Sequence, residues 1–313
     1  MKTFQNKVSV VTGAGSGMGK YLALNLAQEG SDVVICDINQ KALNETEDLI
    51  KAYNVSCSSL NLDLREKNNI DTLVEETISN HGKIDLLFNN AGVVTASPFL
   101  EMKESDWDWC NDLNYNSLVY CSRAFLPHLK KESESSLVNT SSIFCIITTP
   151  NNTVYHATKF AVRGFTESLA MELRDDPIQI NCVYPGHIGT NIVLDARFKK
   201  EILLTNGEYA KDANGKPLTV EDVGSTFRET GMNPNKAAKI ILKGVKKNKR
   251  RIFVGLDAKV MEIAQRLSPS HYIRIIPILN LLIFPYFLKR IKMMKTFYSV
   301  SYTHLTLPTN REV

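Results

Sequence analysis

The chain has 313 residues, of which 43% are hydrophobic and 22% are charged, and its formal net charge is +4. These values are typical of an ordinary globular protein, long enough for one large α/β domain with an appendage. They give no reason to expect nucleic-acid binding, and the basic stretch 246–251 is interpreted as the solvated end of a helix. The six cysteines show neither C-x-x-C nor metal-ligand spacing, so we expect reduced core residues, no metal site and a cytoplasmic protein. The first strand is expected so near the N-terminus that no signal peptide precedes it.

Apolar runs alternate with helical patterns along the chain, which predicts a parallel sheet with helices between its strands. The expected strands are residues 7–12, 32–37, 55–62, 84–89, 135–140, 178–184 and 251–254. The expected helices are residues 18–29, 40–53, 66–80, 104–131, 153–174 and 234–247. Gly30 and Gly82 follow helix ends, where a left-handed cap is favoured. Seven strands joined by right-handed crossovers predict a doubly wound α/β fold, in which ligands lie at the carboxyl ends of the strands.

A glycine-rich turn follows the first strand directly and precedes a helical pattern. Glycines let the backbone approach a pyrophosphate, whose charge is favoured by the N-terminus of the next helix. We therefore predict a phosphate-binding turn, although the spacing is not G-x-G-x-x-G and such turns also close ordinary strand–helix junctions. The residues expected at the cofactor are Thr12, Gly13, Ser16, Gly17, Met18 and Gly19.

Carboxylates follow the second and third strands. Asp37 stands about 20 residues after the glycine turn, where a carboxylate accepts hydrogen bonds from an adenosine ribose and repels a 2′-phosphate. Because the turn contains no Lys or Arg, NAD is favoured over NADP; the alternative is an Asp that caps the next helix. Asp63, which is followed by Leu64, could meet the adenine amino group, or it could be the N-cap of the helix that begins near Glu66.

Polar residues also follow the fourth and fifth strands. Asn90, Ala91 and Gly92 would let a cofactor lie against the backbone, although consecutive asparagines are also common in turns. Tyr155 and Lys159 share one face of a predicted helix, where an ammonium lowers the pKa of a phenol from about 10. Such a pair is expected about once by chance in a chain of this composition, so its value lies in its place after the fifth strand.

The order and separation of these segments closely resemble the short-chain dehydrogenase/reductase family over roughly residues 4–256. The T-G-x-x-x-G-x-G, N-N-A-G and Y-x-x-x-K patterns of that family match the segments that begin at Thr12, Asn89 and Tyr155. The P-G-x-x-x-T pattern of the family implies further cofactor contacts at Pro185, Gly186, Ile188 and Thr190. The catalytic residues of the family correspond to Asn114, Ser142, Tyr155 and Lys159, and Ser142 is favoured over Ser141 by its spacing from the tyrosine.

The resemblance implies a Rossmann-type fold and reversible hydride transfer between a nicotinamide and an alcohol, ketone or aldehyde. Tyr155 would exchange the proton, Lys159 would lower its pKa and hold the nicotinamide ribose, and Ser142 would stabilise the developing alkoxide. Asn114 would anchor a water that passes the proton to solvent. The resemblance also implies a homodimer or homotetramer formed through helices 104–131 and 153–174. Two alternatives stay open: a 3-oxoacyl carrier-protein reductase, typically shorter and NADP-dependent, and a non-catalytic NAD-binding scaffold.

Substrate recognition is expected from residues 190–233 of a catalytic domain that spans residues 1–256. The apolar residues of 192–204 predict an amphipathic lid over the cleft or, equally, an ordinary surface helix. No clear helix is expected between 191 and 233, which makes this connection unusually long. Phe144, Ile146 and Ile147 suggest an apolar pocket.

A hydrophobic extension, residues 257–299, follows this domain. Its residues 275–288 are overwhelmingly apolar but are fewer than the roughly 20 needed to span a bilayer, and basic residues follow them at once. We expect either peripheral membrane contact through 271–295 or packing on the catalytic domain or across a subunit interface. Residues 300–313 resemble the translation of a sequencing adapter, so we exclude them from the interpretation of fold and function.

Overall fold

One seven-stranded parallel sheet organises the protein in a computed structural model that describes residues 2–197, 215–217 and 219–272. The strand order is β3-β2-β1-β4-β5-β6-β7, so the direction of winding reverses between β1 and β4. The strands are β1 (Val8–Thr12), β2 (Asp32–Asp37), β3 (Cys57–Asn61), β4 (Leu86–Asn89), β5 (Ser135–Thr140), β6 (Ile178–Pro185) and β7 (Arg251–Val254). All seven predicted strands are present, and the doubly wound α/β fold is confirmed.

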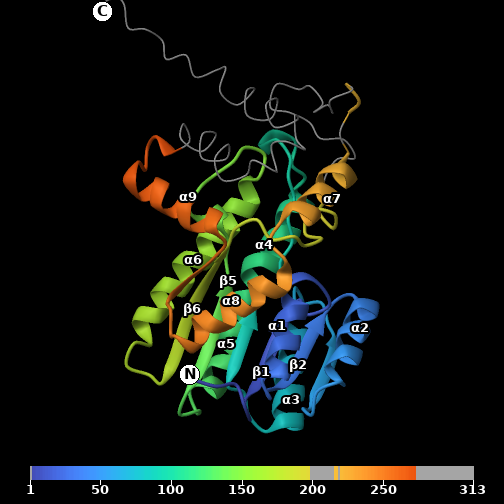
Figure 1. Cartoon of the computed structure of the whole chain (residues 1–313), viewed down its shortest axis with the longest axis vertical. Helices are drawn as coiled ribbons and strands as arrows, with labels where there is room; N and C mark the ends of the chain where they lie inside the picture. Colours follow the sequence, from blue (N-terminus) through green and yellow to red (C-terminus); the bar gives the residue numbers. More distant parts are fainter. Residues whose placement is uncertain (1, 198–214, 218, 273–313) are drawn as a thin grey trace, which may run out of the picture.

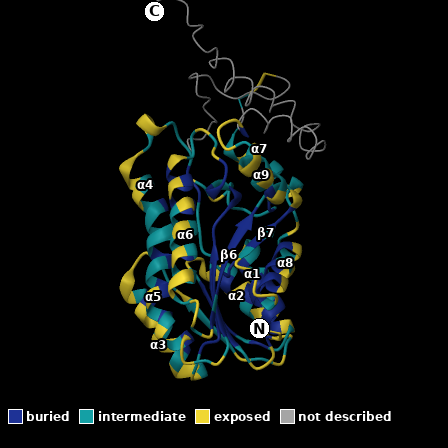
Figure 2. Ribbon diagram, turned by 90° about the vertical axis from the view of Figure 1, so that its left-hand side faces the viewer, coloured by how far each residue is buried: buried dark blue, intermediate teal, exposed yellow. Residues whose placement is uncertain are grey.

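Helices cover both faces of the sheet (Figures 1 and 2). One face packs against α1 (Gly17–Gln28), α2 (Gln40–Ile50) and α8 (Pro234–Lys246), and the other packs against α3 (Lys67–His81), α5 (Ser117–Leu129) and α6 (Thr153–Glu172). Neighbouring residues of one strand therefore enter opposite cores: Val11 lies under the first group of helices and Val10 under the second. A sheet covered on both sides needs apolar residues at consecutive positions, which explains the valine-rich first strand.

Two helix ends were predicted from glycines, and both predictions are confirmed. Gly82 is the C-cap of α3 with a φ of 74°, and Gly30 follows the end of α1 with a φ of 82°. In this left-handed region a residue with a Cβ atom is strained, so glycine is the favoured residue at both turns.

The predicted helix 104–131 is divided into three parts. α4 (Glu104–Asn111) leads into a π-helical turn, Asp112–Asn116, and α5 continues from there. A π turn adds one residue to a single helical turn and changes the apolar pattern little. The periodicity of the sequence therefore does not reveal it. The turn contains Asn114, one of the predicted catalytic residues.

Two helices were missed by the sequence interpretation. α7 (Val220–Thr230) interrupts the expected long connection between 191 and 233, and Thr219 and Asp222 form a capping box at its start. α9 (Leu256–Leu267) follows β7 and packs against the 3-10 helix Ile143–Cys145. Residues 192–195 form a turn instead of the start of a helix. The rest of the predicted lid, 198–204, the polar stretch up to 214, most of the extension, 273–299, and the excluded residues 300–313 lie outside the described residues. No helix among the described residues is long and apolar enough to cross a bilayer.

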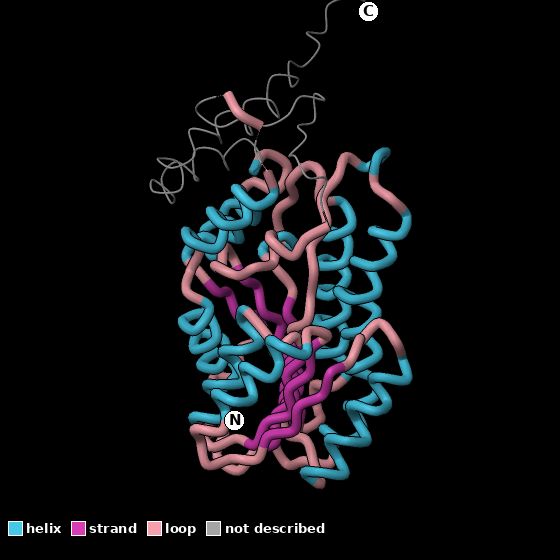
Figure 3. Tube along the Cα trace, turned by 90° about the vertical axis from the view of Figure 1, so that its right-hand side faces the viewer, coloured by secondary structure: helices cyan, strands magenta, loops and turns pink. Residues whose placement is uncertain are grey.

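The carboxyl ends of the strands point toward α7 and α9 in Figure 1, whereas the N-terminus of the chain lies at the opposite end of the sheet. Figure 3 shows the same separation, with the strands below and long loops above them. Every predicted site residue that follows a strand is therefore brought to one end of the molecule.

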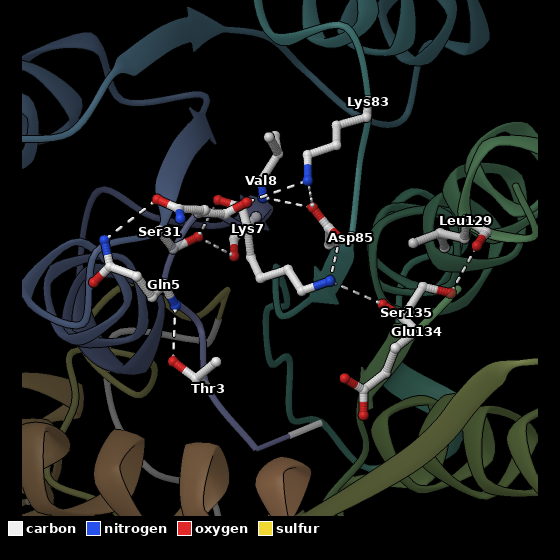
Figure 4. Close-up of polar contacts among 12 residues, drawn as sticks. Thr3, Gln5, Lys7, Val8, Ser31, Lys83, Asp85, Leu129, Glu134 and Ser135 are labelled. Atoms are coloured by element: carbon white, nitrogen blue, oxygen red, sulfur yellow. Dashed lines mark hydrogen bonds and ion pairs between the residues drawn. The ribbon is translucent and has the colours of Figure 1, made fainter. Parts of the chain in front are cut away.

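A fully buried carboxylate joins β1 to β4 at the other end of the sheet (Figure 4). Asp85 accepts hydrogen bonds from the Lys7 ammonium at 2.7 Å and from the Val8 N–H at 2.9 Å, and its second oxygen lies 3.0 Å from the Lys83 ammonium. Both oxygens of Asp85 are thus engaged at the point where the two central strands begin.

Replacing Asp85 with Ala is expected to lower the free energy of unfolding by about 2 kcal/mol, because it leaves the Val8 N–H and two ammonium groups without this acceptor. This loss of stability is smaller than that expected for a fully buried ion pair, because both lysines are partly exposed. Urea unfolding measures it. Asp48→Ala, which removes an exposed pair with Lys51, is the matched control and should leave stability nearly unchanged. Equal effects of the two substitutions would contradict the prediction.

Candidate active site

The glycine-rich turn closes directly onto the end of β4. Gly13 has a φ of 66°, and a Cβ atom placed on it would lie 2.8 Å from the Cα atom of Ala91. A Cβ atom on Gly19 would collide with the carbonyl oxygen of Gly13, and one on Gly17, whose φ is 53°, would lie 3.2 Å from a methyl carbon of Thr190. The glycines are therefore required by close packing between the turn, the N-N-A-G segment and the P-G-x-x-x-T segment.

The N-terminus of α1 opens out of this turn. Ser16 is the N-cap residue, and no side chain among the described residues caps the helix or places an acidic group in its first turn. Met18 directs a partly buried side chain into the core. Uncapped backbone N–H groups at a helix N-terminus bind phosphate well, so the turn fits the pyrophosphate of a dinucleotide.

Hydrogen bonds from Thr12 hold the N-N-A-G segment in place. The Thr12 hydroxyl accepts the N–H groups of Asn90 at 3.0 Å and Ala91 at 3.1 Å, and the Asn90 amide donates to the Thr12 carbonyl at 3.1 Å. The Asn90 amide oxygen is buried and has no hydrogen-bond partner among the described residues. Asn89 ties β4 to β5 through the Asn139 side chain at 2.9 Å. The segment is more than a turn, because it joins strands and leaves two buried amide oxygens, those of Asn89 and Asn90, without a partner among the described residues.

Asp37 lies at the end of β2, beside the glycine turn. Its carboxylate accepts the N–H groups of Gly15 and Asn39, both at 2.9 Å. The alternative that Asp37 caps the next helix is wrong, because Asn39 is the N-cap of α2 and accepts the Ala42 N–H. Burial and the charge of Asp37 together raise the pKa of Asp195, so a second carboxylate, which the sequence interpretation missed, stands near the first. A carboxylate at the position of Asp37 disfavours a phosphate group there.

Asp63 is engaged by a nearby arginine. Its two oxygens accept the Arg65 guanidinium, and this interaction holds the pKa of Asp63 below its ordinary value. The expectation that Asp63 is an N-cap is wrong, since Glu66 occupies the N-cap position of α3. Leu64 is buried in the core beneath α3 and α5. Contact of Asp63 with an adenine amino group stays a prediction.

Lys159 and Tyr155 lie on one face of α6, as predicted. The Lys159 ammonium donates to the Thr140 carbonyl at 3.1 Å and lies 5.6 Å from the centre of the Tyr155 ring. A Cβ atom on Gly92 would lie 3.4 Å from this ammonium and 3.2 Å from the Asn114 amide oxygen. β4, β5, α6 and the π turn therefore converge on one small region, in which a side chain at position 92 would press against Asn114.

Asn114 supports the backbone of this region. Its amide oxygen accepts the Val93 N–H at 2.8 Å, and its amide nitrogen donates to the Val93 carbonyl at 2.9 Å and also contacts the Thr158 hydroxyl at 3.3 Å. The side chain thus pairs with the loop after β4 as a neighbouring strand would. Its predicted role as the anchor of a water is not tested by these contacts.

Ser142 and Ser141 have different partners, which supports the choice of Ser142 for catalysis. The Ser142 hydroxyl accepts the Phe144 N–H at 3.1 Å and hydrogen-bonds with Tyr155. The Ser141 hydroxyl instead donates to the Lys159 carbonyl at 2.8 Å and fixes the helix. The hydrogen bond with Ser142 lowers the pKa of Tyr155, so the Ser142 hydroxyl donates its proton toward the phenolic oxygen.

Burial dominates the protonation of the catalytic pair. It raises the pKa of Tyr155 to about 12, with a smaller opposing effect from the Ser142 hydrogen bond, and it lowers the pKa of Lys159 to about 8. The expected lowering of the tyrosine pKa by Lys159 is not observed in the protein alone. The reason is that the same burial that brings the two groups together disfavours both tyrosinate and ammonium.

For the hydride transfer that the sequence predicts, these pKa values predict different pH dependences in the two directions. A proton donor with a pKa of about 12 stays protonated near neutral pH, so ketone reduction should change little between about pH 6 and pH 8. Alcohol oxidation needs the deprotonated tyrosine, so its kcat/KM should rise with pH over the same range. Initial rates in both directions measure this. An oxidation rate that reaches its plateau below about pH 7 would contradict it.

His156, which the sequence interpretation missed, holds the loop that follows Ser142. Its Nδ1 donates to the Phe144 carbonyl at 2.8 Å, and its Nε2 accepts the Thr149 N–H at 2.9 Å, a pattern that requires the neutral ring. Burial lowers its pKa, in agreement with this assignment. The sequence could not have revealed these hydrogen bonds, because a single histidine after Tyr155 forms no recognisable pattern.

The P-G-x-x-x-T segment begins at Pro185, the last residue of β6, and is held from two sides. The start of α9 contributes Asp257, whose carboxylate accepts the His187 N–H and leaves no room for a Cβ atom on Gly186. On the other side, Met232 exchanges backbone hydrogen bonds with His187 and Gly189, both at 2.9 Å.

Inside the segment, the Ile188 carbonyl accepts the Thr190 N–H at 2.8 Å and the Ile188 side chain is buried in the core. The backbone groups of Ile188 are thus partly used within the segment, and its contact with a nicotinamide stays a prediction. Asp257 was missed because its partner lies 70 residues away in the chain.

Replacing Asp257 with Ala is expected to raise the KM for the dinucleotide by about tenfold, because the 186–190 segment loses a charge-assisted hydrogen bond. Asp257→Asn keeps an acceptor of the same shape and should recover most of the loss. Steady-state kinetics of the two variants measure this, with thermal unfolding as the check on folding. If the Asn variant is as impaired as the Ala variant, the hydrogen bond is not what positions the segment.

Comparison with known proteins agrees with this geometry. Residues 7–201 match the family model described as short chain dehydrogenase. A protein of Mycobacterium tuberculosis named as the oxidoreductase SadH is 32% identical over 278 residues, which cover 88% of this chain and 96% of that protein. A cyclohexanol dehydrogenase of an Acinetobacter species is 36% identical over 193 residues, which cover 61% of this chain and 77% of the relative.

A crystal structure of a short chain dehydrogenase/reductase from Burkholderia phymatum, solved in complex with NAD, has the same fold. The TM-score is 0.74 at 23% identity, and the match covers 86% of this chain and 96% of that one. The family match extends over more than half of the chain, and the SadH relative aligns with nearly all of it. The protein is therefore a member of the short-chain dehydrogenase family of oxidoreductases.

Proposed function

We propose that the protein is an NAD-dependent dehydrogenase that interconverts an apolar alcohol and its ketone or aldehyde. The observation that carries the proposal is the convergence of Ser142, Tyr155 and Lys159 at the carboxyl end of the sheet, next to a glycine turn shaped for a pyrophosphate. A bound nicotinamide would supply the hydride acceptor or donor. The residues of the chain supply orientation and the proton.

Each side chain has a task that its contacts allow. Tyr155 takes the proton of the alcohol during oxidation and returns it to the carbonyl oxygen during reduction. Ser142 donates its hydroxyl proton to the same oxygen. Lys159, buried against the Thr140 carbonyl, places a positive charge where tyrosinate and alkoxide develop.

An apolar substrate is supported by the surroundings of Tyr155. Its ring contacts Phe144 edge to face at a centroid distance of 6.1 Å. The cluster around it is completed by apolar side chains from the loop after β4, from α4 and from the turn after Thr190: Val94, Met102, Trp107, Trp109, Cys110, Ile192 and Ala196. A small polar substrate would find few hydrogen-bond partners among these groups.

Preference for NAD is supported by the charge at the adenosine end of the site. Asp37 presents negative charge beside Gly15, and a 2′-phosphate would meet this charge. The same position in an NADP-dependent enzyme needs a cation.

The test is NADH formation with a panel of linear and cyclic secondary alcohols, run beside reduction of a 3-oxoacyl thioester with NADPH. The proposal expects turnover with an apolar alcohol and NAD. Faster reduction of the thioester with NADPH would favour the carrier-protein reductase alternative. Tight NADH binding without turnover of any alcohol would favour the non-catalytic scaffold.

A further inference from the structure

The segment formed by residues 190–197 packs against the side chains that surround the catalytic tyrosine. Ile192 and Ala196, both partly buried, contact the apolar cluster that contains Tyr155 and Val94. The position of this segment therefore determines how much room is left for the apolar part of a substrate beside the Tyr155 hydroxyl. What fixes the segment in this position is found at its last residue, Arg197.

The backbone of Arg197 is attached to the loop between β4 and α4. Its N–H donates to the Val94 carbonyl at 3.3 Å, and its carbonyl accepts the Thr95 hydroxyl at 2.7 Å. Thr95 is buried, and it pairs with Arg197 as residues of two parallel strands would. Two segments that are about 100 residues apart in the chain are thus joined beside the active site.

The loop to which Arg197 is attached is itself held by the catalytic segments. The Ser97 N–H donates to the Asn151 carbonyl at 2.8 Å, in the stretch between Ser142 and α6. At its start, the loop exchanges hydrogen bonds with the Asn114 side chain. Arg197 therefore connects the 190–197 segment to a part of the site that is fixed from two other directions.

The side chain of Arg197 adds an attachment to α4. Its guanidinium carbon lies 4.0 Å from the centre of the Trp109 ring, and a guanidinium nitrogen lies 3.3 Å from an Asp106 oxygen. Trp109 in turn packs against the cluster around Tyr155. Because the Arg197 and Asp106 side chains are 45% and 26% exposed, the ion pair alone contributes little. A planar guanidinium can stack on an indole and pair with a carboxylate at once, so this position suits arginine better than lysine.

We propose that Arg197 is a positioning residue for substrate binding: it holds residues 190–197 against α4 and the loop after β4, and so keeps Ile192 and Ala196 beside Tyr155. The proposal rests on the proposed function, because it assigns the apolar part of the alcohol to this wall. None of the contacts of Arg197 among the described residues is with a catalytic side chain. Its loss should therefore weaken substrate binding more than it slows the chemical step.

The first test is steady-state kinetics of Arg197→Ala with the secondary alcohol that the protein turns over fastest. We expect the KM for the alcohol to rise about fivefold, with kcat and the KM for NAD within about twofold of the original values. Arg197→Lys keeps the charge near Asp106 but loses the planar stack on Trp109, so it should recover only part of the loss. The matched control is Arg174→Ala, which removes an exposed ion pair with Asp175 between α6 and β6. An unchanged KM in Arg197→Ala, or an equal rise in Arg174→Ala, overturns the proposal.

The second test does not depend on turnover. Amide hydrogen exchange in peptides that cover residues 190–197 measures how firmly the segment is held, because the Arg197 N–H is bonded to the Val94 carbonyl. We expect exchange there to be about fivefold faster in Arg197→Ala than in the original protein or in Arg174→Ala. Equal exchange in the three proteins overturns the positioning role, even if alcohols are turned over. Faster exchange in Arg197→Ala of a protein that turns over no alcohol supports the attachment and contradicts the proposed reaction instead.

Discussion

Replacing Tyr155 with Phe is expected to lower kcat in both reaction directions by about a thousandfold. The substitution removes the proton donor and acceptor but keeps the ring that packs against Phe144. Binding of NADH should therefore change little, because the glycine turn and Asp37 are untouched. Single-turnover rates measure the chemical step, and fluorescence titration with NADH measures binding.

Tyr184→Phe is the matched control for this experiment. Tyr184 is also fully buried, and its hydroxyl donates to Glu167 at 3.1 Å, away from Ser142 and Lys159. Loss of this hydroxyl should lower stability but leave kcat nearly unchanged. A Tyr155→Phe protein that keeps more than about a tenth of the original kcat would show that another group transfers the proton.

Replacing Asp37 with Ala is expected to reduce the preference for NAD over NADP by at least about tenfold. The variant loses the negative charge that repels a 2′-phosphate, and it also loses the acceptor for the Gly15 and Asn39 N–H groups. The change should consist of better kcat/KM with NADP and poorer kcat/KM with NAD.

Asp32→Ala controls for a general effect of removing a carboxylate from β2. Asp32 stands at the start of the same strand and accepts the Ser56 N–H at 2.7 Å, far from the glycine turn. It should leave the cofactor preference unchanged. If the unsubstituted protein uses NADPH better than NADH, Asp37 does not determine the preference between the two cofactors.

The sequence predicted those features that depend on neighbouring residues. Strands buried on both faces show as apolar runs, and the turns at Gly30 and Gly82 need a residue that tolerates positive φ. The catalytic segments were recognised by their order and spacing, and the structure gathers Asn114, Ser142 and the Tyr155–Lys159 pair as that order implied.

Features that depend on distant pairing were not predictable in this way. α7 was missed because its capping residues Thr219 and Asp222 follow a long polar stretch that resembles a loop. α9 was missed because its two apolar sides blur the helical pattern. The pKa of Tyr155 depends on how deeply the folded chain buries it, which no local spacing encodes.

The hydrogen bond from Asp257, at the start of α9, to the His187 N–H also affects the order in which the protein folds during synthesis. A ribosome releases β1 through β6 before Asp257 has been synthesised, since 70 residues separate that carboxylate from His187. The first six strands can therefore assemble on a nascent chain in which residues 186–190 still lack the hydrogen bond from Asp257. A chain interrupted before Asp257 would keep these strands but lack the hydrogen bond that fixes residues 186–190, so we expect it to bind a dinucleotide more weakly than the full-length chain.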